Sequence, residues 1–114
     1  MTYLDSKKVV RRLTQKDIRD SLMQQLKLQH KTSKFYEDLV NDYMYYYKLK
    51  KDLIKDIKEN GIRYKTVNGN GIETDKANES VINLQKTTTI MLKILSDLHL
   101  KEPVEDNTVV DDYL

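Results

Sequence analysis

Apolar residues recur at helical spacing in three stretches of the chain, and a short alternating stretch separates the second from the third. The first stretch repeats its apolar residues every four positions, at Ile18, Leu22 and Leu26. Thr14 precedes these residues and Asp17 follows it three positions later, an arrangement typical of a capped helix N-terminus. The pattern predicts a first helix that begins near Thr14 and fades around residues 28–31.

The second apolar stretch is the longest. Thr32 or Ser33 is suited to cap its start, and Gly61 follows Asn60 as the kind of residue that ends many helices. Its apolar face is formed by Leu39, Tyr43, Tyr46, Leu53 and Ile57, widened by Phe35, Tyr36, Val40 and Ile54. A helix of about 27 residues, roughly 40 Å long, exceeds what one small domain needs. We therefore expect another helix or another subunit to cover it.

All three glycines of the chain lie within residues 59–71. Residues 62–67 alternate between two faces, an Asn-Gly-Asn-Gly sequence turns the chain, and residues 72–74 pair back, which predicts a β-hairpin over 62–74. A third helix should start between Asp75 and Ser80, because apolar residues then return at heptad spacing. This seam consists of Val81, Leu84, Met91, Leu95 and Leu98, with Thr88 as a further member.

These elements predict one mainly α-helical domain: a helical hairpin with a long central helix, a short β-hairpin and a C-terminal heptad-like helix. We divide the chain into a basic N-terminal arm (1–13), a helical core and oligomerisation domain (14–100) and an acidic C-terminal tail (101–114). The apolar stripes exceed what a 114-residue fold covers alone, so we expect an oligomer larger than a dimer. The expected interface residues are Tyr43, Tyr46, Leu84, Met91, Leu95 and Leu98.

Composition narrows the chemistry. Cysteine and tryptophan are absent, which excludes a disulfide scaffold, a thiolate nucleophile and a cysteine-based zinc site, and which fits a reducing cytoplasm. No apolar run is long enough to span a bilayer or to form a secretory signal. The net charge of +2 conceals a gradient, with +6 over residues 1–58 and −4 over residues 101–114. This gradient indicates a polyanion partner at one end and another partner, or an electrostatic self-cover, at the other.

Candidate catalytic groups are few. His30 and His99 both stand near predicted helix ends, where solvated caps are more common than metal ligands. The carboxylate pairs Asp38/Asp42 and Asp52/Asp56 lie among lysines and favour surface ion pairs. The Asn-Gly-Asn-Gly turn lacks the Lys-Ser/Thr of a phosphate-binding loop. We therefore expect no catalytic, cofactor-binding or metal-binding residue, and a protein that acts by binding rather than as an enzyme.

Charge selects the residues that are candidates for contact with nucleic acid. The candidates in and after the arm are Lys7, Lys8, Arg11, Arg12, Lys16 and Arg19, and those on the hairpin are Arg63 and Lys65. Such side chains neutralise phosphates with little sequence discrimination. A solvated flexible terminus and an exposed sheet face are the alternatives. The tyrosines at 43 and 45–47 cannot share one helix face, which favours packing over base stacking.

Several short segments, taken in order, resemble one protein family. They are Thr14-Gln-Lys-Asp-Ile18, Lys34-Phe-Tyr-Glu-Asp-Leu-Val-Asn-Asp-Tyr-Met44, Glu59-Asn-Gly61, Asn68-Gly69, Lys76-Ala-Asn-Glu-Ser80, Leu84-Gln-Lys86 and Met91-Leu-Lys-Ile-Leu-Ser-Asp-Leu98. In this order, over residues 13–103, the chain resembles the P27-type small terminase subunit of tailed bacteriophages. The resemblance implies a non-enzymatic DNA-packaging factor of the host cytoplasm. It would recognise double-stranded viral DNA, assemble into a ring-like oligomer and deliver DNA to a large terminase subunit with ATPase and nuclease activity.

Two other functions remain open at this point. A small helix-turn-helix regulator would use the first helix and the start of the second, although a helix of about 27 residues is long for a recognition helix. A structural oligomeric adaptor would keep the heptad seam and leave the arm idle. For the acidic tail we expect either docking of the large subunit or shielding of the basic surface.

Overall fold

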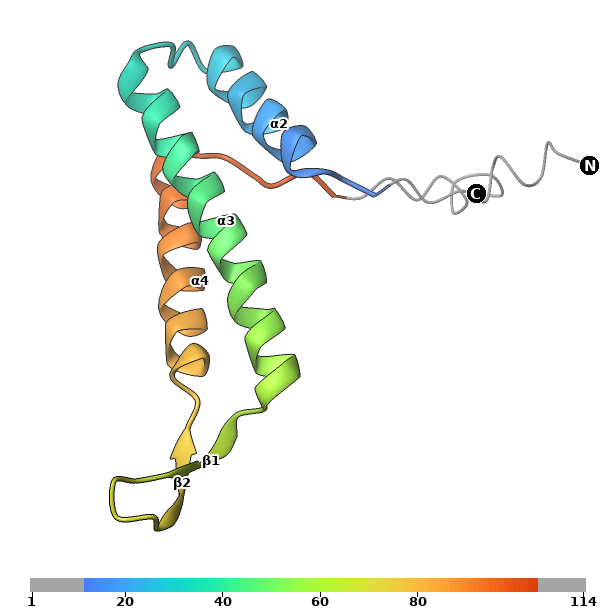
Figure 1. Cartoon of the computed structure of the whole chain (residues 1–114). Helices are drawn as coiled ribbons and strands as arrows, with labels where there is room; N and C mark the ends of the chain where they lie inside the picture. The colour runs from blue at the N-terminus through green and yellow to red at the C-terminus, as the bar shows by residue number, and fades with distance from the viewer. Residues whose placement is uncertain (1–11, 105–114) are drawn as a thin grey trace, which may run out of the picture.

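The computed structural model describes residues 12–104, which form a mainly helical protein (Figure 1). Within this range the elements are α2 (Gln15–Leu28), α3 (Lys34–Asn60), β1 (Arg63–Val67), β2 (Glu73–Ala77) and α4 (Glu79–Leu98). The long α3 and the shorter α4 lie side by side and run in opposite directions (Figure 1). The β-hairpin extends from one end of this pair, and α2 folds back along the other end. The predicted mainly α architecture with its central long helix and short hairpin is confirmed.

Local sequence accounts for the ends of α2. The Thr14 hydroxyl accepts a hydrogen bond from the Asp17 amide at 3.1 Å, and the Asp17 carboxylate accepts one from the Thr14 amide at 2.9 Å. This reciprocal pair is a capping box, and it fixes the start that the sequence predicts. At the other end His30 adopts a left-handed conformation with φ of 59°, and the Lys31 amide donates to the Leu26 carbonyl at 2.9 Å. These two features form a Schellman-type stop.

The predicted ends of α3 also agree with the structure. Ser33 occupies the position before the helix, although its side chain makes no capping hydrogen bond. Gly61, with φ of +78°, follows the last helical residue, and its amide donates to the Ile57 carbonyl at 2.7 Å. A side chain is strained at this positive φ, which explains why glycine stands there.

The core lies at the end of the molecule where all three helices meet. It is formed by Ile18, Leu22 and Leu26 of α2, Val40 and Tyr43 of α3, and Met91, Leu98 and Leu100 of α4 and the segment after it. Beyond Tyr43, no residue of α3 is fully buried, because only α4 packs against the rest of the long helix. The hydrophobic stabilisation of the fold is therefore concentrated near α2.

Three details differ from the sequence-based expectations. Phe35 was expected to widen the buried face of α3, but it is 64% exposed because it lies at the start of the helix. In α4 the fully buried threonine is Thr87, whereas Thr88 of the predicted seam is only half-buried. The second strand runs over Glu73–Ala77 instead of 72–74, with Arg63 opposite Ala77 and Val67 opposite Glu73. Its last residues are all exposed, so no apolar alternation signalled them.

The residues that follow α4 cross back over α2, and we call residues 98–102 the strap. The Gln25 side chain exchanges two hydrogen bonds with the Lys101 backbone, at 2.6 and 2.8 Å. Gln29 donates to the His99 carbonyl at 2.9 Å, and Lys31 donates to the Leu98 carbonyl at 3.0 Å. Side chains of α2 and the loop after it thus satisfy carbonyls that the end of α4 leaves free. The first residues assigned to the acidic tail are held on the helices by these contacts.

Candidate nucleic-acid interface

The basic residues predicted near the N-terminus fall into two groups. Lys7, Lys8 and Arg11 lie outside the described residues. Arg12 is exposed and lies two residues before Thr14, the cap of α2. Lys16 is exposed on the first turn of α2, and its ammonium group lies 2.7 Å from the Asp20 carboxylate. The hydrogen bond and the charge of Asp20 raise the pKa of Lys16, so the lysine stays charged and is paired with a carboxylate.

Arg19 connects two helices. Its guanidinium donates to the Asn41 side chain at 3.2 Å and lies 3.5 Å from the Glu37 carboxylate, so it bridges α2 and α3. A guanidinium held by two partners is positioned for packing of the helices, and a phosphate would have to compete with Glu37. Both Lys16 and Arg19 therefore have intramolecular acidic partners: Asp20 lies one helical turn from Lys16, whereas Glu37 lies 18 positions from Arg19 and was not evident from the sequence.

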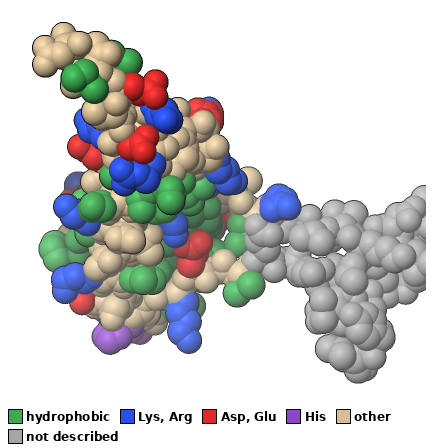
Figure 2. Space-filling model, turned by 90° about the horizontal axis from the view of Figure 1, so that it is seen from below, with side chains coloured by type: hydrophobic (Ala, Val, Ile, Leu, Met, Phe, Trp, Pro, Cys, Tyr) green, Lys and Arg blue, Asp and Glu red, His purple; other side chains and the backbone are tan. Residues whose placement is uncertain are grey.

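The hairpin carries the second predicted pair, Arg63 and Lys65, and both are exposed on one face of β1. The same face of β2 presents Asp75 directly opposite Lys65, and Glu73 lies 3.3 Å from the Lys65 ammonium group. Two acids thus balance the two bases. In Figure 2, basic side chains (blue) and acidic side chains (red) are interspersed over the face shown. The described part of the chain does not gather the predicted cations into a single basic patch.

A cluster of polar residues fixes the hairpin to the helices, and we call it the clamp. Asp56 of α3 accepts hydrogen bonds from Ser80 at 2.7 Å, Asn60 at 2.8 Å and Asn78 at 2.9 Å. Asn78 also donates to the Gly61 carbonyl at 2.9 Å. The hydrogen bonds from Ser80, Asn78 and Asn60 lower the pKa of Asp56. The sequence suggested a surface ion pair for Asp56, and this expectation was wrong: among the described residues its partners are neutral amide and hydroxyl groups.

A second fixed contact lies at the opposite end of the fold. The Tyr43 hydroxyl donates a hydrogen bond to the Glu102 carboxylate, which lies just beyond the core. Burial of the ring, followed by the hydrogen bond and charge of Glu102, raises the pKa of Tyr43. The tyrosine remains neutral at physiological pH and acts as a donor. This contact holds the end of the strap on α3.

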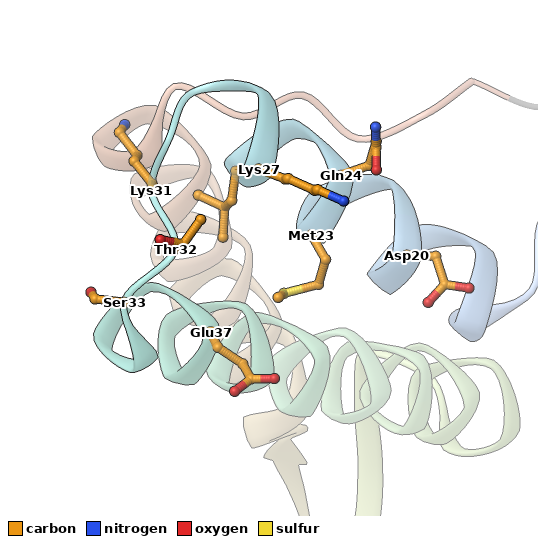
Figure 3. Close-up of a pocket in the computed structure, with 9 residues that line it drawn as sticks. Asp20, Met23, Gln24, Lys27, Lys31, Thr32, Ser33 and Glu37 are labelled. Carbon is orange, nitrogen blue, oxygen red and sulfur yellow. The ribbon is translucent and has the colours of Figure 1, made fainter.

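A hollow of about 400 Å³ lies between α2 and the start of α3 (Figure 3). Its lining includes Asp20 and Lys27 from α2, Lys31 from the loop, and Glu37 from α3. Charges of both signs face this space, and Glu37 is engaged with Arg19 and, at 3.9 Å, with Lys34. The hollow lacks the convergent base and nucleophile of a catalytic site.

The predicted interface residues also divide into two groups. Tyr43, Met91 and Leu98 are buried within the protomer, where they belong to its core. Tyr46, Leu84 and Leu95 are half-buried. The apolar side chains that α4 exposes are Ile82, Ile90 and Leu92, none of which was among the predicted interface residues. An oligomeric assembly stays a prediction.

Residues 12–104 contain neither a metal-binding cluster nor a membrane-spanning helix. No group of three or more His, Cys, Asp or Glu residues in this range is arranged to hold a metal ion. None of the helices in the same range is long and apolar enough to cross a membrane. The two histidines serve the backbone instead, because His30 and His99 are the left-handed residues that end α2 and α4.

Comparison with known proteins identifies the family. The sequence profile described as "Phage terminase, small subunit" matches residues 16–104. This range contains all the described helices and strands except the first residue of α2. No curated protein and no solved structure matches the chain. The profile covers well over half of the 114 residues, and the chain therefore belongs to the phage terminase small-subunit family.

Proposed function

We propose that this chain is a P27-type small terminase subunit that recognises viral DNA and delivers it to the large terminase subunit. The profile match over residues 16–104 carries the proposal, because the family acts in phage DNA packaging. The protein is not itself an enzyme in this role and works in the host cytoplasm. It assembles into a ring, and the separate large subunit supplies ATP hydrolysis and DNA cleavage.

The arm is the proposed DNA contact. Residues 1–13 carry Lys7, Lys8, Arg11 and Arg12 against a single acid, Asp5. Of the other predicted cations, Lys16, Arg19 and Lys65 each have an acidic partner, and Arg63 shares its face of the hairpin with Asp75 and Glu73. DNA phosphates are bound best by a segment in which basic residues outnumber acidic ones, as they do in the arm. The arm therefore contributes most of the affinity and little sequence discrimination.

A salt titration tests this assignment. Double-stranded DNA binding is measured by fluorescence anisotropy for the native chain and for a variant with Lys7, Lys8, Arg11 and Arg12 all changed to Ala. Each lost phosphate contact should lower the slope of log K against log salt by about 0.9. The matched control replaces the hairpin pair Arg63 and Lys65 by Ala and should change the slope much less. A slope that falls in the hairpin variant and not in the arm variant would refute the assignment.

Ring assembly is supported by exposed apolar surface on α4. Ile82 is 57% exposed and lies outside the core, and a second subunit is the simplest cover for such a position. Changing Ile82 to Asp should dissociate the assembly while preserving helical content, because this residue does not belong to the protomer's core. Light scattering after size-exclusion chromatography measures the mass. A native chain that stays monomeric at micromolar concentration would rule out the ring.

The helix-turn-helix regulator is less consistent with the fold. Its recognition helix would be α3, but this helix has 27 residues and packs against α2 at one end and α4 along its length. A recognition helix must present its first residues to a major groove. Here the first turns of α3 contribute Glu37, whose carboxylate would face the phosphates. We therefore favour the packaging role over a regulator.

A further inference from the structure

A groove of about 380 Å³ lies between α3 and α4, next to the end of the strap. Its apolar lining includes Ile54 of α3 together with Met91, Leu92 and Leu95 of α4. Leu92 is 61% exposed although it borders the groove. At one end the lining reaches the core residues Tyr43 and Met91 and the strap residue Glu102. Apolar surface of this kind favours an occupant with apolar side chains.

The rim of the groove is basic. Lys50 and Lys51 of α3 both line it, and neither forms an ion pair with another described residue. The Lys51 ammonium group lies 4.9 Å from the centre of the Tyr47 ring, a cation–π contact that holds the lysine at the rim. Glu102, bound to Tyr43, marks the end of the groove where the chain leaves the strap. The site thus combines an apolar floor with two unneutralised cations.

We propose that this groove binds the chain's own residues 105–114. Their sequence, Glu-Asp-Asn-Thr-Val-Val-Asp-Asp-Tyr-Leu, contains four acids and no basic residue. It also contains four apolar side chains, Val109, Val110, Tyr113 and Leu114. Alternating acidic and apolar pairs match a groove with an apolar floor and a basic rim. Docking places Val109 and Val110 over the exposed Leu92 side chain and brings the neighbouring carboxylates to Lys50 and Lys51.

The length of the chain permits this docking. Val104 is 89% exposed, so the backbone leaves the surface there, two residues after Glu102 has lined the groove. Ten further residues reach up to roughly 33–36 Å. The groove spans Tyr43 to Ile54 on α3, which corresponds to roughly 16 Å of helix. Several residues remain available to turn the chain back before it enters the groove.

The tether favours this occupant over a second copy's helices. A segment attached a few residues from its site has an effective concentration in the millimolar range, so weak contacts suffice. α4 of a second copy has two acids and two bases, so it would bring no net charge to the basic rim. Residues 105–114 bring four carboxylates and no base to Lys50 and Lys51. The inference concerns the surface of the protein and is independent of its proposed DNA-packaging role.

Disulfide trapping tests the proposal, because the native chain contains no cysteine. The test variant of the full chain carries Leu92→Cys and Val110→Cys. The matched control carries Ile90→Cys and Val110→Cys: Ile90 is exposed on the same helix, two residues away, and does not line the groove. Disulfide formation is followed under mild oxidation by non-reducing electrophoresis. We expect intramolecular bonding to be roughly tenfold faster in the test variant than in the control, reflecting local concentration at the groove.

A charge variant supplies the second readout. Changing Lys50 and Lys51 to Glu in the test variant should slow trapping by about threefold to tenfold at low salt, and added salt should reduce the difference. Equal trapping rates at positions 92 and 90 would overturn the proposal. A disulfide that forms only between chains would also overturn it, because the groove would then hold the tail of a second copy. Circular dichroism of each variant checks that the helices are intact.

Discussion

Asn78 joins the hairpin to α4 and provides the sharpest test of the clamp. The residue is only 7% exposed, and its side chain makes three hydrogen bonds. Its oxygen accepts from the Ser80 amide at 3.0 Å, which caps α4, while its nitrogen donates to Asp56 and to the Gly61 carbonyl, both at 2.9 Å. Changing Asn78 to Ala removes all three contacts without enlarging the side chain.

The expected loss follows from these contacts. Removing an N-cap costs about 1 kcal/mol, and each lost hydrogen bond of the buried amide costs about 1 kcal/mol. We therefore expect Asn78→Ala to lower the free energy of unfolding by about 2–3 kcal/mol. Asn78→Asp separates the two roles, because aspartate is as good an N-cap as asparagine. It cannot donate to the Gly61 carbonyl, and it places a second carboxylate beside Asp56.

Urea unfolding followed by circular dichroism measures the effect, with all proteins at the same protomer concentration because assembly raises apparent stability. We expect Asn78→Asp to be at least as unstable as Asn78→Ala. The matched control is Asn83→Asp, which makes the same change at an exposed position of α4 and should stay within about 0.5 kcal/mol of the native chain. If Asn78→Asp and the native chain have the same midpoint of urea unfolding, Asn78 acts only as a helix cap and the clamp does not hold the hairpin.

Four further variants test other features of the fold. His99→Gly should stabilise the protein by about 0.5–1 kcal/mol, because His99 has φ of 56°, where glycine avoids the strain of a side chain, and no gain in thermal unfolding would contradict this. Tyr43→Phe should cost about 1–2 kcal/mol by removing the hydrogen bond to Glu102, and a native-like melting temperature would show that the strap needs no such contact. The native chain should lose stability as the pH falls below the ordinary carboxyl pKa of 3.8, because the clamp lowers the pKa of Asp56 and so favours its charged form. Asp56→Asn should remove that part of the pH dependence. If the stability of both proteins depends on pH in the same way, this mechanism is excluded. Deleting residues 105–114 should lower the melting temperature only slightly, because the core ends at Leu100 and a weakly docked segment adds little stability; a large decrease would show that these residues belong to the core.

The helices were predictable because their signals are local. The four-residue repeat of Ile18, Leu22 and Leu26 is buried as expected, and the Thr14 cap and the Gly61 stop stand where the sequence suggested. Periodicity and caps involve residues within a few positions of each other, so a single sequence contains the whole signal. The sequence placed the start of α4 only between Asp75 and Ser80, because this stretch contains several polar residues and nothing local singles out Asn78 as the cap.

The contacts that hold the elements together were not predictable. Gln25 and Lys101 are 76 positions apart, and Asn78 lies 22 positions from Asp56. Glutamine and asparagine are common on surfaces, so nothing in their local sequence marks them as partners. The sequence placed His30 and His99 near helix ends and predicted that their imidazoles would be solvated caps there. In the structure it is their left-handed backbone conformation that ends the helices.

The candidate interface illustrates the same limit. The excess of basic residues in the first half of the chain is a property of the sequence, but its distribution over the surface depends on long-range neighbours. Glu37 reaches Arg19 across two helices, and Glu73 reaches Lys65 across the hairpin. A count of charges along the chain does not show that these acids lie next to the basic side chains and offset their charge. The arm remains the strongest DNA candidate because it contains a single acid among four bases.

The two ends of the protein differ in how deeply their side chains are buried. At one end α2, the core and the strap form a layer-on-layer packing, while at the other end α3 and α4 form a single pair closed by the clamp. Local opening is easiest where few apolar contacts must be broken, so the hairpin end should exchange its amide hydrogens before the core end. Apolar side chains such as Ile82 and Leu92 are exposed along the thinner part. A segment or subunit that covers them adds the missing layer, and binding there would stabilise the part of the fold that is least protected by its own core.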